Sequence, residues 1–157
     1  MPLTGTSPAI RVLAEGGGGA VGARISASFS GTYLTDPNPF PFDTADWGAA
    51  AYMVNLASHA LTIPVTGRYL VAAVILGAAS LVADHSMGFE VENTGDDVVR
   101  PAFYGEVKAG PSNGISATAS TPMSLAAGDE LTVRVSTDGI ALDFSGINCA
   151  LAVIPIP

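Results

Sequence analysis

Residues 60–77 read ALTIPVTGRYLVAAVILG, and this stretch decides the class of fold. A turn at Thr66-Gly67 separates a short apolar segment from Arg68–Leu76, which is apolar almost without interruption. Such a run is typical of a strand covered on both faces or of a buried helix. The glycines at both ends, Gly67 and Gly77, and a length of about nine residues favour the strand.

Segments on both sides of this strand carry the same kind of pattern. Apolar and β-branched residues recur about every ten residues, separated by turn signals such as Asp138-Gly139. Thr35–Phe42 holds three prolines and is expected to be an extended, irregular loop. The expected strands are Arg24–Phe29, Ala60–Val65, Arg68–Leu76, Met87–Asn93, Val98–Val107, Ile115–Met123, Leu131–Thr137 and Phe144–Ile154. They predict an all-β sandwich or barrel.

The composition is poor in charge. Hydrophobic residues make up 48% of the 157 residues and charged residues only 13%, whereas ordinary domains contain about 25% charged residues. Either the surface is merely neutral, or a large face is buried against copies of the chain or against a neighbouring protein, and we favour the second interpretation. The net charge is −8, and the six Lys and Arg residues are scattered. These features argue against nucleic acid or an anionic membrane as partner.

Residues 1–22 differ from the rest of the chain. A short apolar piece, Ile10-Arg11-Val12-Leu13, precedes the four glycines Gly16–Gly19, which cannot hold a helix or strand cheaply. We expect a flexible arm at 1–22 and one domain at 23–157, and a disordered tail is the alternative for the arm. No secretory signal is visible at the N-terminus. The single cysteine, Cys149, lies in an apolar run and is expected to be a buried, inert thiol.

Four pieces of the chain resemble, in order, the globular heads of the complement and tumour-necrosis-factor superfamily. Phe40-Pro-Phe-Asp43 with Trp47 resembles the family's phenylalanine-aspartate strand, and Leu61–Val74 resembles its glycine-x-tyrosine strand. Met123–Val135 resembles a strand, an L-x-x-G-D turn and the next strand. Phe144–Val153 resembles the closing F-S-G strand. The resemblance spans about residues 23–154.

The resemblance implies a ten-stranded jelly roll that forms a homotrimer. Isolated domains of this kind are familiar as virion proteins of tailed bacteriophages. We therefore expect a trimeric decoration protein that stabilises a phage head, with host-glycan or host-protein binding at a tail tip as the alternative. The protein would be located in the virion, which is assembled in the host cytoplasm. Its partners would be further copies of the same chain and the major capsid protein or another virion protein. Capsid docking is expected of Ile10, Arg11, Val12 and Leu13, and trimer or core packing of Phe42, Trp47, Tyr69, Val71, Phe144 and Leu151.

Residues able to carry catalysis are few. The two histidines, His59 and His85, each follow a polar residue in sequence, but neither stands in a metal-ligand spacing or a triad pattern. We therefore expect no enzymatic activity. No cofactor is expected either.

Two charged features leave alternatives open. Four carboxylates lie close together in the sequence and could bind calcium, although a solvated strand edge and turn is the simpler interpretation. They are Glu90, Glu92, Asp96 and Asp97. Arg68, at the start of the most apolar strand, either lies in solvent at a strand end or forms a salt bridge across a subunit interface.

Overall fold

The computed structural model describes residues 22–28, 33–48, 53–78, 85–93, 100–109, 114–139, 141–144 and 149–157. The predicted arm residues Ile10, Arg11, Val12 and Leu13 and the acidic residues Asp96 and Asp97 lie outside these ranges. The division into an arm and a domain therefore stays a prediction. The first strand begins at Ala23, which is the first residue of the predicted domain.

Twelve β-strands make up the secondary structure of the described residues, and no helix there is long and apolar enough to cross a membrane. The strands are β1 (Ala23–Ser26), β2 (Tyr33–Leu34), β3 (Thr44–Gly48), β4 (Val54–Asn55), β5 (Ala60–Thr62), β6 (Gly67–Ala78), β7 (His85–Asn93), β8 (Arg100–Ala109), β9 (Gly114–Leu125), β10 (Glu130–Thr137), β11 (Leu142–Asp143) and β12 (Ala150–Pro155).

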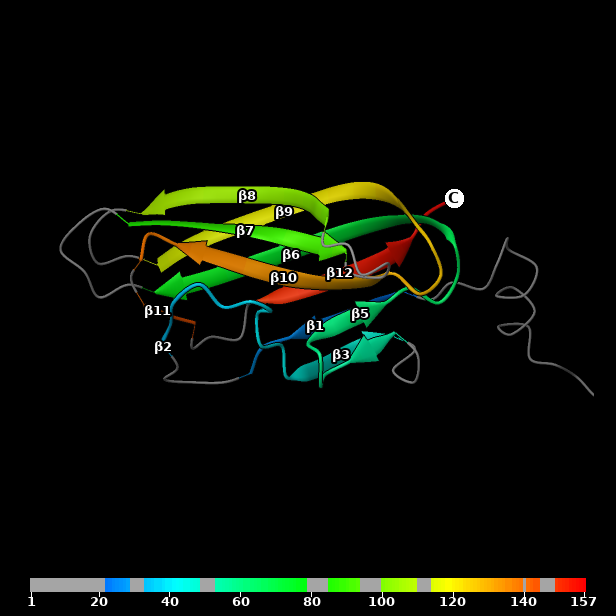
Figure 1. The fold of residues 1–157 in the computed structure, drawn as a ribbon, viewed down its shortest axis with the longest axis horizontal. Helices are drawn as coiled ribbons and strands as arrows, with labels where there is room; N and C mark the ends of the chain where they lie inside the picture. Colours follow the sequence, from blue (N-terminus) through cyan, green and yellow to red (C-terminus); the bar gives the residue numbers. More distant parts are fainter. Residues whose placement is uncertain are drawn as a thin grey trace, which may run out of the picture.

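The strands form two sheets that pack face to face (Figure 1). The seven-stranded sheet has the order β2-β11-β6-β12-β1-β3, and β9 pairs with the other side of β6. The five-stranded sheet has the order β4-β5-β10-β7-β8. The prediction of an all-β sandwich is confirmed.

The number of strands differs from the predicted ten. Strands β2, β4 and β11 are only two residues long, and without them five strands remain in one sheet and four in the other. The sequence reading missed β3, Thr44–Gly48, since TADWG lacks a run of β-branched residues. Pairing with β1 holds this segment in the sheet instead.

Strand β6 occupies a central place in the seven-stranded sheet. It pairs along its whole length with β9, from Gly67 opposite Leu125 to Ala78 opposite Gly114. On its other side it pairs with β12, from Tyr69 opposite Pro155 to Val74 opposite Ala150. The predicted turn-and-strand at residues 66–76 is therefore confirmed as the start and body of β6.

The core lies between the two sheets and contains an aromatic cluster. Phe40 packs against Phe42 and Phe144, with ring centroids 5.0 and 5.3 Å apart, and all three side chains are fully buried. The buried Tyr69 satisfies its hydroxyl by donating a hydrogen bond to the carbonyl of Val65 at 2.6 Å. Burial of a phenylalanine side chain stabilises a fold by about 1.5–3 kcal/mol, so this cluster anchors the sandwich.

The proline-rich segment before β3 also contributes to the core. The backbone N–H of Phe40 donates to Val133, and that of Val135 donates to Pro37, at 2.6 and 3.0 Å. The carboxylate of Asp36 accepts the N–H of Thr137 at 2.6 Å. The segment therefore runs beside β10 beyond the point where β5 ends, and it satisfies backbone groups that an edge strand would leave open.

Candidate subunit interface

The predicted packing residues fall into two groups. Five of them are fully buried in the core between the sheets, namely Phe42, Tyr69, Val71, Phe144 and Leu151. The sixth, Trp47, is 45% exposed on the outside of the molecule. Because the five are fully buried within one chain, a subunit contact in this fold has to be built from other residues, and Trp47 alone of the set is available for it.

The outer face of β6 is apolar. Alternate residues from Tyr69 to Ile75 are buried toward the core, and the residues between them point outward and are half-buried. These outward positions are Leu70, Ala72, Val74 and Leu76. An antiparallel sheet with one face in water normally alternates apolar and polar residues. Strand β6 does not, so its outer side carries apolar surface that its own core does not use.

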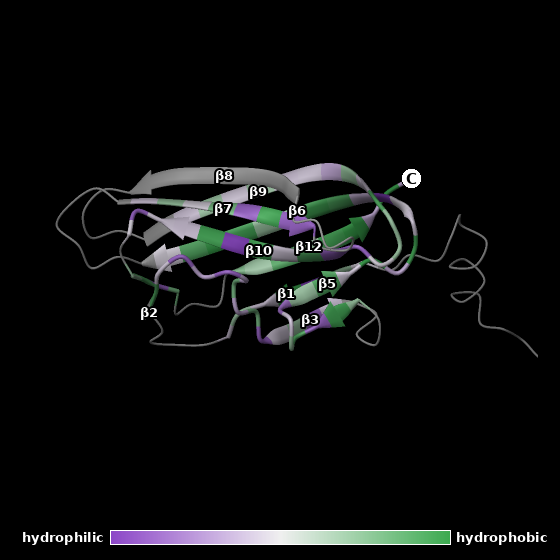
Figure 2. Cartoon of the chain, in the orientation of Figure 1, coloured by the Kyte–Doolittle hydropathy of each residue, from purple (hydrophilic) through white to green (hydrophobic). Residues whose placement is uncertain are grey.

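Strand β12 extends this apolar surface sideways. In the sheet register Ile154 lies opposite Leu70, Ala152 opposite Ala72, and Ala150 opposite Val74. Ile154 is 41% exposed. Figure 2 shows β6 and β12 as predominantly hydrophobic strands. We call the outward residues Leu70, Ala72 and Val74 of β6 and Ala152 and Ile154 of β12 the apolar face, because Leu76 packs against the core and Ala150 is buried.

Hydroxyl-bearing side chains border the apolar face on the side of β9. The outward residues of β9 are exposed, and four of the five carry hydroxyls: Ser116, Thr118, Ser120 and Ser124, with Pro122 between them. Each lies opposite an outward residue of β6. The face therefore has an apolar centre and a polar margin, which is the usual anatomy of a protein–protein interface.

An irregularity in the pairing of β1 with β3 shapes the opposite margin. Arg24 lies opposite Trp47 and Ile25 opposite Ala45, so Asp46 has no partner in the register. Such a bulge can turn two successive side chains to one face. The Asp46 carboxylate here accepts hydrogen bonds from Arg24 at 2.5 Å and from Ser26 at 2.8 Å. Charged groups at this margin are thus already paired within the chain.

Trp47 lies over Gly22 at the same margin. A Cβ atom at Gly22 would come within 2.9 Å of the indole ring and within 3.0 Å of the carbonyl oxygen of Val153. Glycine therefore provides the room in which the indole lies. This exposed aromatic side chain lies where the apolar centre meets the Arg24–Asp46 pair, and no local sequence pattern indicates that it points outward.

The outer face of the five-stranded sheet is polar by contrast. Arg134 of β10 lies 4.0 Å from Glu90 and 3.8 Å from Glu92 of the neighbouring strand β7. Thr62 of β5 donates a hydrogen bond to Glu130 at 3.4 Å. Hydrophilic patches on β7 and β10 are visible in Figure 2. This face can remain in contact with water.

The contact with Arg134 also bears on the predicted metal site. Glu90 and Glu92 pair with a cation of the protein itself, and the other two residues of the predicted set lie outside the described ranges. In the part of the chain that the structure describes, no three His, Cys, Asp or Glu side chains gather closely enough to hold a metal ion.

Among the side chains that the structure describes, which do not include that of His85, the polar groups that could have served catalysis have structural partners. The His59 ring nitrogen Nδ1 is 2.7 Å from the carbonyl oxygen of Phe42, to which it donates as an N–H. Ser58 Oγ contacts the carbonyl of Asn55 instead of the histidine beside it. Burial raises the pKa of the Cys149 thiol, and its Sγ atom lies 3.2 Å from the backbone of Leu76. A thiol of this kind is unreactive.

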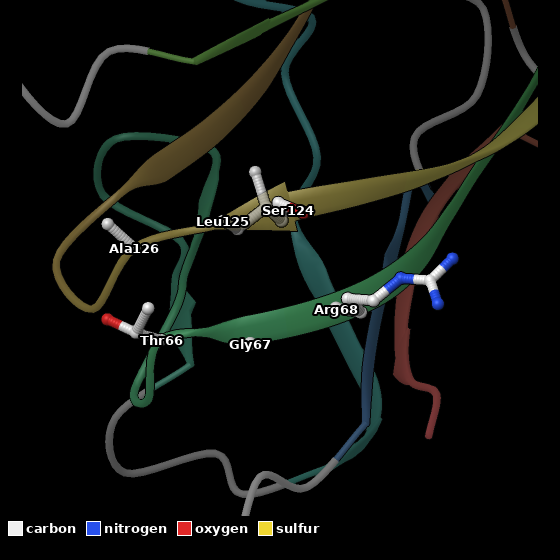
Figure 3. Close-up of a pocket in the computed structure, with 6 residues that line it drawn as sticks. All are labelled: Thr66, Gly67, Arg68, Ser124, Leu125 and Ala126. Atoms are coloured by element: carbon white, nitrogen blue, oxygen red, sulfur yellow. The ribbon is translucent and has the colours of Figure 1, made fainter.

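A shallow hollow lies at the end of the sheet where β9 leads into the turn and β6 begins (Figure 3). It is lined by Thr66, Gly67, Arg68, Ser124, Leu125 and Ala126. In Figure 3 the Arg68 side chain extends away from Thr66, along the sheet. The lining residues therefore present apolar groups, two hydroxyls and a guanidinium but no general base beside the hydroxyls, and the hollow suits packing better than chemistry.

Comparison with solved structures defines the class of fold. The chain is similar to the Eiger TNF of S. frugiperda, with a TM-score of 0.71 at 16% identity, covering 88% of this chain and 93% of that one. It is also similar to murine APRIL at pH 5.0, with a TM-score of 0.65 at 15% identity, covering 87% and 99% of the two chains. No protein-family model and no curated protein sequence matches the chain.

The chain is therefore a TNF-like jelly roll, and the predicted resemblance is confirmed at the level of the fold.

Proposed function

We propose that the chain is a non-enzymatic homotrimer assembled through the apolar face of the seven-stranded sheet. The observation that carries this proposal is that β6 is apolar on both of its sides while the chain's own core uses only one. Covering Leu70, Val74 and Ile154 removes apolar surface from water, worth about 25 cal/mol for each Å². A ring of three identical subunits covers this surface in every copy.

The finer proposal is that the trimer decorates the head of a tailed bacteriophage. Its support is the family resemblance together with the apolar segment Ile10–Leu13, which four glycines separate from the jelly roll. A trimer carries three such segments on one rigid body. Three weak contacts held together in this way bind far more tightly than one, because the second and third are intramolecular.

A capsid-binding assay tests this finer proposal. Removing residues 1–15 leaves the glycine tether and Gly22 in place, so trimers are expected to form while attachment to capsids of the phage that encodes the chain is lost. The full-length variant carrying Ile10→Ser and Val12→Ser serves as the matched control for chain length, and it is expected to attach weakly. Unchanged attachment of either protein would refute the role of the arm.

The same preparation tests the alternative of host binding. A glycan array probed with the intact trimer is expected to show no specific signal if the chain is a decoration protein. Reproducible binding to one glycan class, together with unchanged capsid attachment after removal of residues 1–15, would replace the decoration proposal with a receptor-binding one.

A further inference from the structure

Arg68 has an unusual position in the seven-stranded sheet. It is the only charged residue in β6, β9 and β12 together. It lies on the outer side of β6, next to Leu70 along the strand and opposite Ser124 of β9. Its exposed side chain lines one end of the hollow and extends along the sheet, away from Thr66 (Figure 3). A guanidinium thus stands at the end of the apolar face.

The other arginines with described side chains are paired. Arg24 binds Asp46, and Arg134 lies beside Glu90 and Glu92. Within the described ranges, the Arg68 side chain has no carboxylate or other side-chain partner. Its backbone pairs with β9 opposite Ser124, and its carbonyl accepts the N–H of Ile156.

The acidic side chains that the structure describes are already engaged within the chain. Asp43, Asp129 and Asp138 accept hydrogen bonds from backbone or amide groups, and Asp143 also has a partner. The remaining carboxylates bind backbone, hydroxyl or arginine groups, and they are Asp36, Asp46, Glu90, Glu92 and Glu130. An anion for Arg68 therefore has to come from outside the described part of one chain.

Assembly raises the free-energy cost of leaving the Arg68 guanidinium without an anion. In a free subunit water solvates the Arg68 guanidinium, but a neighbour covering the apolar face removes part of that water. Burying an unpaired charge is unfavourable, and this cost opposes association. We infer that Arg68 is an anion-binding position of the assembled protein and takes a carboxylate at the end of the apolar face. This inference rests on the proposed trimer.

A carboxylate is the ligand that the guanidinium fits best. Its two oxygens match two parallel N–H donors of the planar guanidinium, which gives a bidentate contact. The Ser124 hydroxyl, on the adjacent strand, is a further donor at the same end of the face. The carboxylate has two sources: an acidic side chain of a neighbouring copy, or a dissolved carboxylate held between subunits.

Sedimentation equilibrium with a matched pair of variants tests the inference. Arg68→Gln and Arg134→Gln change the net charge equally, but Arg134 lies on the other sheet. At low ionic strength we expect the trimer of Arg68→Gln to dissociate at about tenfold higher protein concentration than wild type. We expect Arg134→Gln to assemble like wild type. The gap between Arg68→Gln and wild type should close at high salt, because salt screens the lost ion pair.

Added citrate at constant ionic strength separates the two sources. Tightening of the wild-type trimer but not of Arg68→Gln identifies a dissolved carboxylate, and no tightening identifies a side chain of the neighbouring copy. Equal or tighter assembly of Arg68→Gln than wild type would overturn the inference and leave the trimer standing. A wild-type chain that stays monomeric would overturn the proposed function itself, and this inference with it.

Discussion

The two sheets of this sandwich share one core but have opposite outer faces. On the five-stranded sheet Arg134 pairs with Glu90 and Glu92, so the outer surface is charged and internally matched. On the seven-stranded sheet the outward residues of β6 are all apolar from Leu70 onward. The core cannot account for this difference, because it lies between the sheets and contacts both equally. We attribute it to different surroundings, water for one face and a neighbouring subunit for the other.

A carboxylate placed on each face tests this difference most strongly. Val74→Glu puts a charge in the middle of the apolar face, where association would bury it unpaired. We expect the trimer to dissociate at a concentration at least about a hundredfold higher than wild type, as measured by analytical ultracentrifugation. Ser136→Glu, on the outer side of β10, is the matched control and should assemble normally. If Val74→Glu assembled as well as Ser136→Glu, the apolar face would not be the contact.

The charged face is expected to contribute to the stability of the subunit but not to its assembly. Glu92 is only 4% exposed, so removal of its partner leaves a mostly buried carboxylate without a cation. Arg134→Gln is therefore expected to lower the free energy of unfolding by about 1 kcal/mol, with the trimer unchanged. Chemical denaturation measures the free energy of unfolding, and light scattering measures the mass of the assembly. A loss of trimer in this variant would mean that both faces take part in assembly.

The fluorescence of Trp47 can be used to probe the margin of the apolar face. Because the chain holds a single tryptophan, its fluorescence comes from this position alone. Gly22→Ala places a Cβ against the indole and the Val153 carbonyl, and it is expected to displace the ring and lower stability by about 1 kcal/mol. The emission maximum should shift in this variant. An emission spectrum identical to wild type would show that the indole does not depend on Gly22.

The smallest expected effect concerns acid. Partial burial by itself raises the pKa of the Asp43 carboxyl. Hydrogen bonds from the backbone and side chain of Ser28 and from the Thr44 hydroxyl outweigh this, and the pKa is lowered. The ionised group therefore stabilises the fold above its unfolded pKa, and this contribution is lost as the pH falls through the lower, folded value.

Asp43→Asn removes this contribution without a change of shape. We expect its unfolding free energy to fall less steeply than that of wild type between neutral pH and about pH 3. Denaturant titrations at several pH values measure both slopes. Equal slopes would show that the hydrogen bonds to Asp43 do not distinguish its two protonation states.

The sequence predicted the all-β class and the central strand because both depend on local pattern. The run Arg68–Leu76 has the composition of a doubly covered strand, and the turns flanking it are short. The resemblance to the superfamily correctly implied the jelly roll. The register between strands could not be predicted from the sequence, because it depends on pairing between distant segments.

Two features of the structure follow from register and were not predictable. The irregularity opposite Arg24 lets Asp46 and Trp47 reach the same margin, and no local signal marks it. Arg134 lies beside Glu90 and Glu92 only because β10 pairs with β7. The sequence analysis assigned these two glutamates to a candidate calcium site because the local sequence does not reveal that an arginine of another strand lies next to them.

The mass of the wild-type protein in solution tests the central claim most directly. Sedimentation equilibrium at micromolar concentration is predicted to give a single species of three times the 15.8 kDa chain mass, with the Trp47 emission shifted to the blue relative to the Val74→Glu monomer. A stable, soluble species of 15.8 kDa with the same emission as that variant would contradict the account.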